Sequence, residues 1–191
     1  MGTTVSILWP YSGSGPSFPY WNIVGPGGLT STSQVIAWGH DQANVFWNQV
    51  WTQQWPGGYP GNTMFGAVSE GSGGWLTSAS GSNWLEFNRL VVDAFLEKLA
   101  TKNGQNSYSQ STTLGLYGSQ VSEFQDLLQA GNWAASEPIV VWIAAIGSFD
   151  CAQAQAAYCP MPTIGGYFPM IWQYGQNPDH DITPYIVDPG I

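Results

Sequence analysis

Two acidic residues, Glu70 and Asp181, are the best candidates for acid–base chemistry in this sequence. Glu70 follows the apolar run 64–68 and precedes the glycine-rich stretch 71–74. Many α/β-barrel enzymes present an acid to substrate from such a position, between an expected strand and a glycine-rich turn. The chain has only 12 acidic residues, so we expect Glu70 to act as a general acid. The alternative is a surface carboxylate without a chemical role.

Asp181 belongs to the segment Asp179-His180-Asp181, which follows Asn177-Pro178. A second carboxylate near a general acid can stabilise the positive charge that develops on a sugar ring during glycoside cleavage. We expect Asp181 to have that role, and His180 is a weaker candidate for proton transfer. The alternative is that the whole segment is a solvated turn.

Alternating strands and helices must position these groups. Strands are expected at 5–9, 64–68, 112–117, 139–146 and 168–174, and helices at 34–54, at 83–102 and, more briefly, between Ser119 and Gly131. Residues 11–33 are rich in Gly, Pro and Ser and are expected to form one long loop. The alternation predicts an α/β fold with a parallel sheet, either open or closed into a barrel.

In a parallel sheet the carboxyl ends of the strands share one rim, where functional loops gather. Besides the two acids, we expect this rim to carry substrate-binding residues. Trp75 would supply apolar surroundings that favour the protonated form of Glu70. The expected substrate-binding residues are Tyr117, Trp75, Gln173, Tyr174, Asp179 and His180.

The composition indicates one domain over residues 1–191 with a sizeable core, since 43% of the residues are hydrophobic. Charged residues make up only 8%, against roughly 25% in ordinary globular chains. The surface must therefore be built from uncharged polar and aromatic residues. Such surfaces are common on secreted proteins that meet carbohydrate and on subunits buried in an assembly.

The net charge of −9 argues against nucleic-acid partners. Arg89, Lys98 and Lys102 are the only Lys or Arg residues, so no basic stripe can neutralise phosphates or anionic lipid. No apolar run approaches the length of a membrane span, and no signal peptide is visible at the start of the sequence. The sequence has no metal-ligand cluster and no phosphate-binding motif, so we expect neither a metal nor a cofactor.

Cys151 and Cys159 are the two cysteines, and their spacing fits neither a zinc site nor a redox motif. A local disulfide is the favoured interpretation, and free thiols are the alternative. Together with the low charge, a disulfide indicates an extracellular location.

Four segments occur in the order TLGLYGS (113–119), VWIA (141–144), IWQY (171–174) and DI (181–182). They resemble the "GIY-S", "LWIA", "WQY" and "VDLN" segments of the family-25 glycoside hydrolases, the lysozyme-type muramidases, and of their secreted glycoside-hydrolase-like relatives. Upstream, FGAVSE (65–70) occupies the place of the family's "DxE" strand end. The resemblance covers about residues 34–188.

The resemblance implies a (β/α) TIM-barrel-like fold that cleaves the glycan strands of peptidoglycan. Glu70 then matches the general acid and Asp181 the late-strand Asp. Two departures matter: Val68 stands in place of the first acid of "DxE", and the family's opening strand has no counterpart. Five strands cannot close an eight-stranded barrel. We therefore expect a reduced barrel covered by a partner, either a homo-oligomer or another assembly, or else a remodelled N-terminal region.

These observations together predict a secreted glycoside-hydrolase-like domain that acts on or binds cell-wall glycan. With an incomplete carboxylate set, the chain is either a lysozyme-like enzyme or a non-catalytic glycan-binding descendant. A structural subunit of an extracellular assembly is the third possibility.

Overall fold

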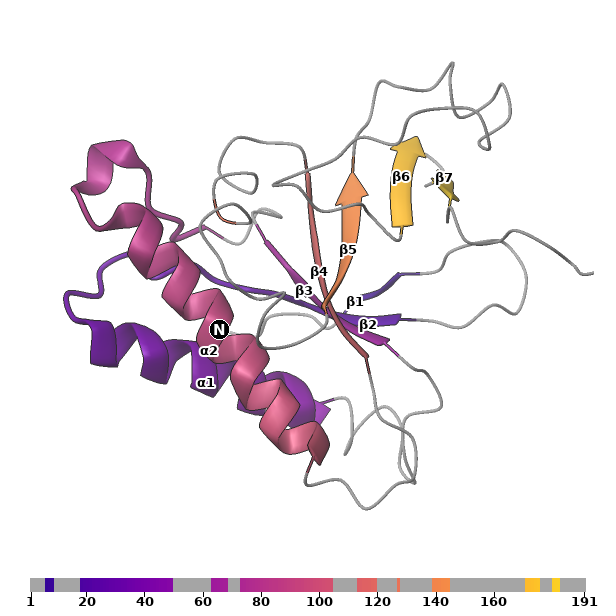
Figure 1. The fold of residues 1–191 in the computed structure, drawn as a ribbon, viewed down its shortest axis with the longest axis horizontal. Coiled ribbons are helices and arrows are strands. Elements are labelled where there is room, and N and C mark those ends of the chain that lie inside the picture. The colour runs from indigo at the N-terminus through magenta and orange to yellow at the C-terminus, as the bar shows by residue number, and fades with distance from the viewer. Residues whose placement is uncertain are drawn as a thin grey trace, which may run out of the picture.

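One sheet with two long helices on one side makes up the described part of the chain (Figure 1). The computed structural model describes residues 6–8, 18–49, 63–68, 73–104, 113–119, 127, 139–144, 171–175 and 180–182. All structural statements below refer to these residues.

The sheet has seven strands, and each lies beside the strand that precedes it in the chain. They are β1 (Ser6–Leu8), β2 (Phe18–Asn22), β3 (Thr63–Ala67), β4 (Thr113–Ser119), β5 (Ile139–Ala144), β6 (Ile171–Gly175) and β7 (His180–Ile182). Strands β2 to β6 pair in parallel, whereas β1 and β7 pair antiparallel at the two edges. A doubly wound sheet reverses its strand order, whereas a (β/α) barrel keeps chain order. No pairing between β1 and β7 is found in the described residues, so barrel closure stays a prediction.

Strand β2 lies inside residues 11–33 and corrects the prediction of one long loop there. Its sequence contains Pro19, which is unfavourable inside a sheet because it cannot donate a hydrogen bond. The pairing of β2 with β3 begins only at Tyr20, so Pro19 stands before that parallel ladder and is opposite Ile7 of β1. Strand β7, with three residues, is too short to show a period in the sequence.

Helix α1 (Thr32–Asn48) follows β2 and begins two residues earlier than the apolar pattern predicts. Ser31 caps it, since its Oγ accepts a hydrogen bond from the Gln34 N–H at 3.4 Å. Its buried positions recur at helical spacing and face the sheet and the second helix; they are Val35, Gly39, Gln42, Ala43 and Phe46. The predicted continuation to residue 54 lies outside the described residues.

Helix α2 (Trp84–Gly104) follows the short 3-10 helix η2 (Ser78–Ser80) and agrees with the helix expected at 83–102 to within two residues at each end. Val91, Phe95 and Leu99 lie on its buried face at a spacing of four residues. Of the short helix expected after Ser119, only Leu127 is described, and it is helical and buried.

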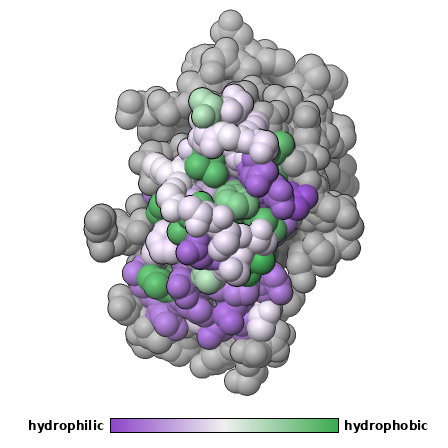
Figure 2. All heavy atoms as spheres, turned by 90° about the vertical axis from the view of Figure 1, so that its left-hand side faces the viewer, coloured by the Kyte–Doolittle hydropathy of each residue, from purple (hydrophilic) through white to green (hydrophobic). Residues whose placement is uncertain are grey.

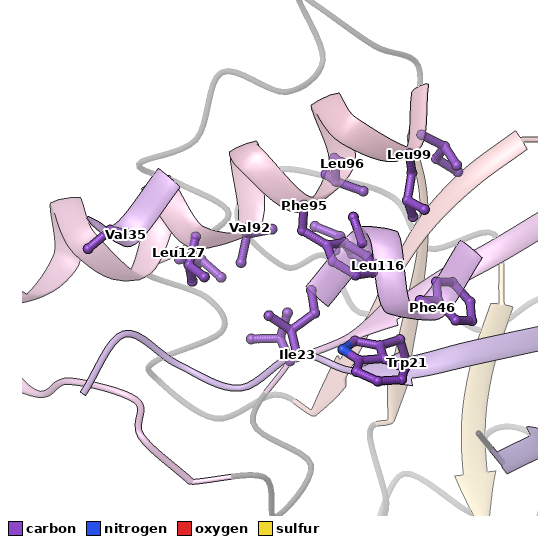
Figure 3. Packing of buried hydrophobic residues seen from close by; sticks show 14 residues of the cluster. Trp21, Ile23, Val35, Phe46, Val92, Phe95, Leu96, Leu99, Leu116 and Leu127 are labelled. Atoms are coloured by element: carbon purple, nitrogen blue, oxygen red, sulfur yellow. The ribbon is translucent and has the colours of Figure 1, made fainter. Parts of the chain in front are cut away.

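The hydrophobic core lies between the helices and one face of the sheet (Figure 3). Phe46 of α1 stacks on Phe95 of α2, with ring centroids 6.1 Å apart, and also contacts Trp21 of β2 at 5.9 Å. Leu114 and Leu116 of β4 enter the same cluster. Because side chains alternate along a strand, the residues between and after them belong to the opposite face of the sheet.

Candidate functional site

Asn22 and Tyr117 lie level with each other on the sheet face that is turned away from the helices. The register pairs Asn22 with Ala67 and Ala67 with Tyr117, so the two residues are two strands apart, about 10 Å. Their chain neighbours Trp21 and Leu116 belong to the core, which places Asn22 and Tyr117 on the other face. Tyr117 is nonetheless only 8% exposed. This tyrosine, expected on the rim, is thus largely covered.

Asp181 lies at the carboxyl end of the parallel strands. The register joins Ser119, Ala144, Gln173 and Asp181 in one rung across β4, β5, β6 and β7. Ser119 and Ala144 are the last residues of their strands. Strand β7 runs antiparallel to β6 and starts at this end of the sheet, which is why its second residue reaches the rung. The backbones of Gln173 and Asp181 are therefore brought together as neighbours.

Two further expected site residues lie at the same carboxyl end of the parallel strands. His180 pairs with Gly175, the last residue of β6. Tyr174 precedes that glycine in β6. Glu70 and Asp179 lie outside the described residues, as do Cys151 and Cys159.

The segment that contains Glu70 is bounded on both sides by hydrogen-bonded backbone. Before it, the Val68 N–H donates to the Tyr117 carbonyl oxygen at 2.8 Å, which extends the β3–β4 ladder by one residue. After it, the Gly73 carbonyl oxygen accepts from the Gly25 N–H at 3.2 Å, and the Gly74 carbonyl oxygen accepts from the Gly27 N–H at 2.7 Å. The loops that follow β2 and β3 are thus joined by their backbones.

We call residues 23–30 and 73–77 together the loop pair. Glycine is required where its two halves meet, since a Cβ on Gly25 would come within 2.5 Å of the Gly74 backbone. Gly74 itself has φ +76, in the left-handed region that glycine tolerates. The glycine-rich sequence after Glu70 is therefore explained by a close contact between loops.

Two polar atoms at this end of the molecule are buried without a hydrogen-bond partner in the described structure: Asn22 Oδ1 and Trp75 Nε1. Buried polar atoms are nearly always paired, so each of these atoms calls for a partner. Trp75 is partly buried and packs against the core cluster. Part of its ring is therefore used in the core and is not free to bind substrate.

Val68 is 1% exposed and belongs to the core cluster on the helix side of the sheet. The family resemblance aligns this position with an acidic residue. A carboxylate here would be buried among apolar side chains, which is costly without a paired charge. Valine therefore fits the position as a core residue, and the first acid of the family pattern has no equivalent at this point of the chain.

Sequence reasoning missed Gln42 and Asn88, the buried polar side chains of the described residues. Each makes a two-way hydrogen bond with the backbone of the loop pair: Gln42 with Val24, and Asn88 with Leu76. The signal that could have found Gln42 is an amide on an otherwise apolar helix stripe, next to Ala43.

Two pairs of charged side chains lie on the helices. His40 of α1 and Glu97 of α2 approach to 4.0 Å, and Arg89 Nε lies 3.6 Å from Asp93 Oδ2 along α2. Burial raises the pKa of Asp93 to about 6, Arg89 lowers it and Glu97 adds to the rise. The first pair joins the two helices and the second lies within α2.

The helix face of the molecule does not present one continuous apolar patch, since apolar residues are scattered among polar ones (Figure 2). Neither described helix combines the length and apolar character that crossing a bilayer requires. Within the described ranges, no group of three His, Cys, Asp or Glu side chains is placed to hold a metal ion. The strand ends with the loop pair are the candidate functional site, because Gln173 and Asp181 share a rung there.

No protein-family model, curated protein or solved structure matches this chain. The family resemblance thus depends on the short segments quoted above.

Proposed function

We propose that this chain is a secreted glycoside-hydrolase-like domain that acts on or binds peptidoglycan at the carboxyl ends of β2 to β6. In this proposal Glu70 is the general acid, and Asp181 stabilises positive charge on the sugar ring. Gln173, Tyr174, Asp179 and His180 belong to the surrounding substrate-binding surface, whereas Tyr117 is largely covered and is not assigned to it.

The observation that carries the proposal is that Val68 and Asp181, far apart in sequence, both lie at the carboxyl ends of the parallel strands. Glu70 follows Val68 by two residues, and Val68 is bonded to the end of β4 through Tyr117. At 3.8 Å per residue, the Glu70 Cα is within about 8 Å of the Val68 Cα. The Asp181 rung contains Ser119, which also ends β4. The proposal therefore puts both acids at the carboxyl end of the parallel strands.

Strand spacing sets a condition on joint catalysis. From β3 to β7 there are four spacings, about 19 Å across a flat sheet at about 4.8 Å each. Carboxylate pairs of glycosidases lie about 5–9.5 Å apart. The proposal therefore requires the sheet to curl so that β3 and β7 approach each other, as strands do in a barrel.

A specific observation favours the non-catalytic alternative. Val68 is a core residue at the position where the resemblance calls for an acid. Removing one electrostatic group that stabilises a transition state, such as an oxyanion-hole donor of an acyl-transfer enzyme, typically costs about 3–4 kcal/mol. A descendant that binds peptidoglycan through the same edge without cleaving it would retain the substrate-binding residues and lose turnover.

The test is to incubate purified, insoluble peptidoglycan with the chain and with Glu70→Gln and Asp181→Asn variants. Release of reducing ends measures cleavage, and co-sedimentation measures binding. Glu86→Gln is the matched control, because Glu86 lies exposed in the first turn of α2. Cleavage lost in Glu70→Gln and kept in Glu86→Gln supports the enzyme.

Co-sedimentation without reducing ends supports the binding module. If the wild-type chain neither cleaves nor sediments with peptidoglycan, the proposal is wrong in both forms. Equal cleavage by the wild type and Glu70→Gln would remove Glu70 from the mechanism.

A further inference from the structure

Gln42 and Asn88 are 3% and 2% exposed, and both stand on helix faces that otherwise carry the apolar core. A buried amide is costly unless its donors and acceptors find partners. Both side chains make two hydrogen bonds to loop backbone outside their own helix, and Gln42 Oε1 also accepts a longer one, 3.4 Å, from Trp21 Nε1 of β2. Their placement is therefore tied to the position of the loops.

Gln42 of α1 satisfies both backbone polar groups of Val24, two residues after β2. Its Nε2 donates to the Val24 carbonyl oxygen at 3.0 Å, and its Oε1 accepts from the Val24 N–H at 2.7 Å. Trp38 Nε1 donates to the same carbonyl oxygen at 3.0 Å. The first half of the loop pair is thus fixed to α1.

Asn88 of α2 repeats this arrangement in the second half. Its Nδ2 donates to the Leu76 carbonyl oxygen at 2.8 Å, and its Oδ1 accepts from the Leu76 N–H at 3.1 Å. Since Gly25 and Gly27 donate to Gly73 and Gly74, the connection continues from α1 through both halves of the loop pair to α2.

We infer that Gln42 and Asn88 are positioning residues that hold the loop pair as one body beside the ends of β2 and β3. Glu70 lies in the segment between Val68 and Gly73. The second half of the loop pair begins at Gly73, so it fixes the C-terminal end of that segment. The importance of this for glycan rests on the proposed function, whereas the coupling between the two halves does not.

The test uses Asn88→Asp, which keeps the acceptor for the Leu76 N–H and replaces the donor by a carboxylate facing a carbonyl oxygen. Residue-resolved amide hydrogen exchange is followed by NMR. We expect exchange at Gly25 and Gly27 to rise about tenfold, although Asn88 bonds to neither glycine. Amides in the middle of α1 and α2 should exchange as in the wild type.

A change of pH supplies a readout that mere loss of packing would not give. When the introduced carboxyl takes up a proton, it regains a donor for the Leu76 carbonyl oxygen. After correction for intrinsic exchange, protection at Gly25 and Gly27 should therefore return towards the wild-type value as the pH falls. Gln42→Glu should behave in the same way through Val24.

Asn44→Asp is the matched control. It makes the same chemical change on α1, and the Asn44 side chain makes no hydrogen bond in the described structure. It should leave exchange at Gly25 and Gly27 unchanged at every pH.

Faster exchange confined to Leu76 in Asn88→Asp, with Gly25 and Gly27 unaffected, would overturn the inference. Binding of soluble peptidoglycan strands is measured on the same samples. If the variants show the expected faster exchange at Gly25 and Gly27 while the wild-type chain fails to bind peptidoglycan, the proposed function is refuted and the positioning role stands.

Discussion

Gly39 of α1 lies directly against the carbonyl oxygen of Val91 in α2, so close that a Cβ on Gly39 would come within 2.5 Å of that oxygen. The contact fixes where the two helices cross, above the strands that carry the candidate site. Glycine in a helix interior normally lowers stability relative to alanine. Its presence here is explained by the close approach.

Gly39→Ala should therefore destabilise the protein, by about 1–3 kcal/mol, because a backbone atom cannot move aside as a side chain can. On helix propensity alone the same change would stabilise by about 1 kcal/mol. Urea unfolding gives the sign. The control is Ala37→Gly on the exposed face of α1, which should cost about 1 kcal/mol. An increase in stability for Gly39→Ala would contradict the described helix crossing.

Gly66 of β3 makes a second close contact, with the Ile23 side chain. A Cβ on Gly66 would lie 2.7 Å from Ile23 Cδ1 and 3.1 Å from Phe95 Cε1. Gly66→Ala should cost about 1–3 kcal/mol, and part of that cost should disappear in an Ile23→Val background, which lacks the Cδ1 methyl. Chemical unfolding of the double-mutant cycle measures the coupling. Strict additivity would show that the two residues do not meet.

Asp93 should make stability depend on pH. Burial raises the pKa of its carboxyl from 3.8 to about 6, so the folded protein retains a proton that the unfolded chain releases. The resulting stabilisation is complete below the unfolded value and is lost as the pH rises through about 6. The free energy of unfolding should therefore fall between these two values.

Asp93→Asn removes that dependence. The variant should exceed the wild type by about 1 kcal/mol near pH 7.5, a figure reduced for solvent screening at this partly exposed side chain. The two curves should converge near pH 4, where the carboxyl is protonated. Exposed Asp41→Asn on α1 is the control and should keep the wild-type slope. A parallel offset between wild type and Asp93→Asn at every pH would refute burial as the cause.

The expected disulfide gives a prediction outside the described residues. If Cys151 and Cys159 pair, the intact mass should rise by two hydrogen atoms on reduction, and both cysteines should alkylate only after reduction. Alkylation of both without reductant would establish free thiols, and would remove this support for an extracellular location.

Sequence patterns located the strands whose apolar character is strong, such as the nearly continuous run that forms β5. They missed β2, because Pro19 and the surrounding glycines are typical of a loop. They missed β7 because three residues carry no period. Strand β7 is an edge strand that pairs on one side only, so its sequence needs less apolar character.

The candidate site was predictable in part. Asp181 follows the last expected strand in the sequence, and this predicted its place at the carboxyl ends of the strands. No sequence pattern indicated that β7 would run antiparallel. Gln42 and Asn88 could not be assigned, because the loop backbones they bond to are 18 and 12 residues away in sequence. Hydrogen bonds of that kind are determined by tertiary packing rather than by local pattern.

The central proposal is that Glu70 and Asp181 lie close together at the carboxyl end of the parallel strands. Cross-linking tests it most directly. Both are replaced by cysteine in a chain whose Cys151 and Cys159 are replaced by serine, and the single-cysteine chains serve as controls. A thiol reagent that spans about 8 Å, within the range of glycosidase carboxylate pairs, should join the two positions in the monomer, as measured by mass. Joining only by a reagent that spans about 19 Å, four strand spacings, would contradict the account.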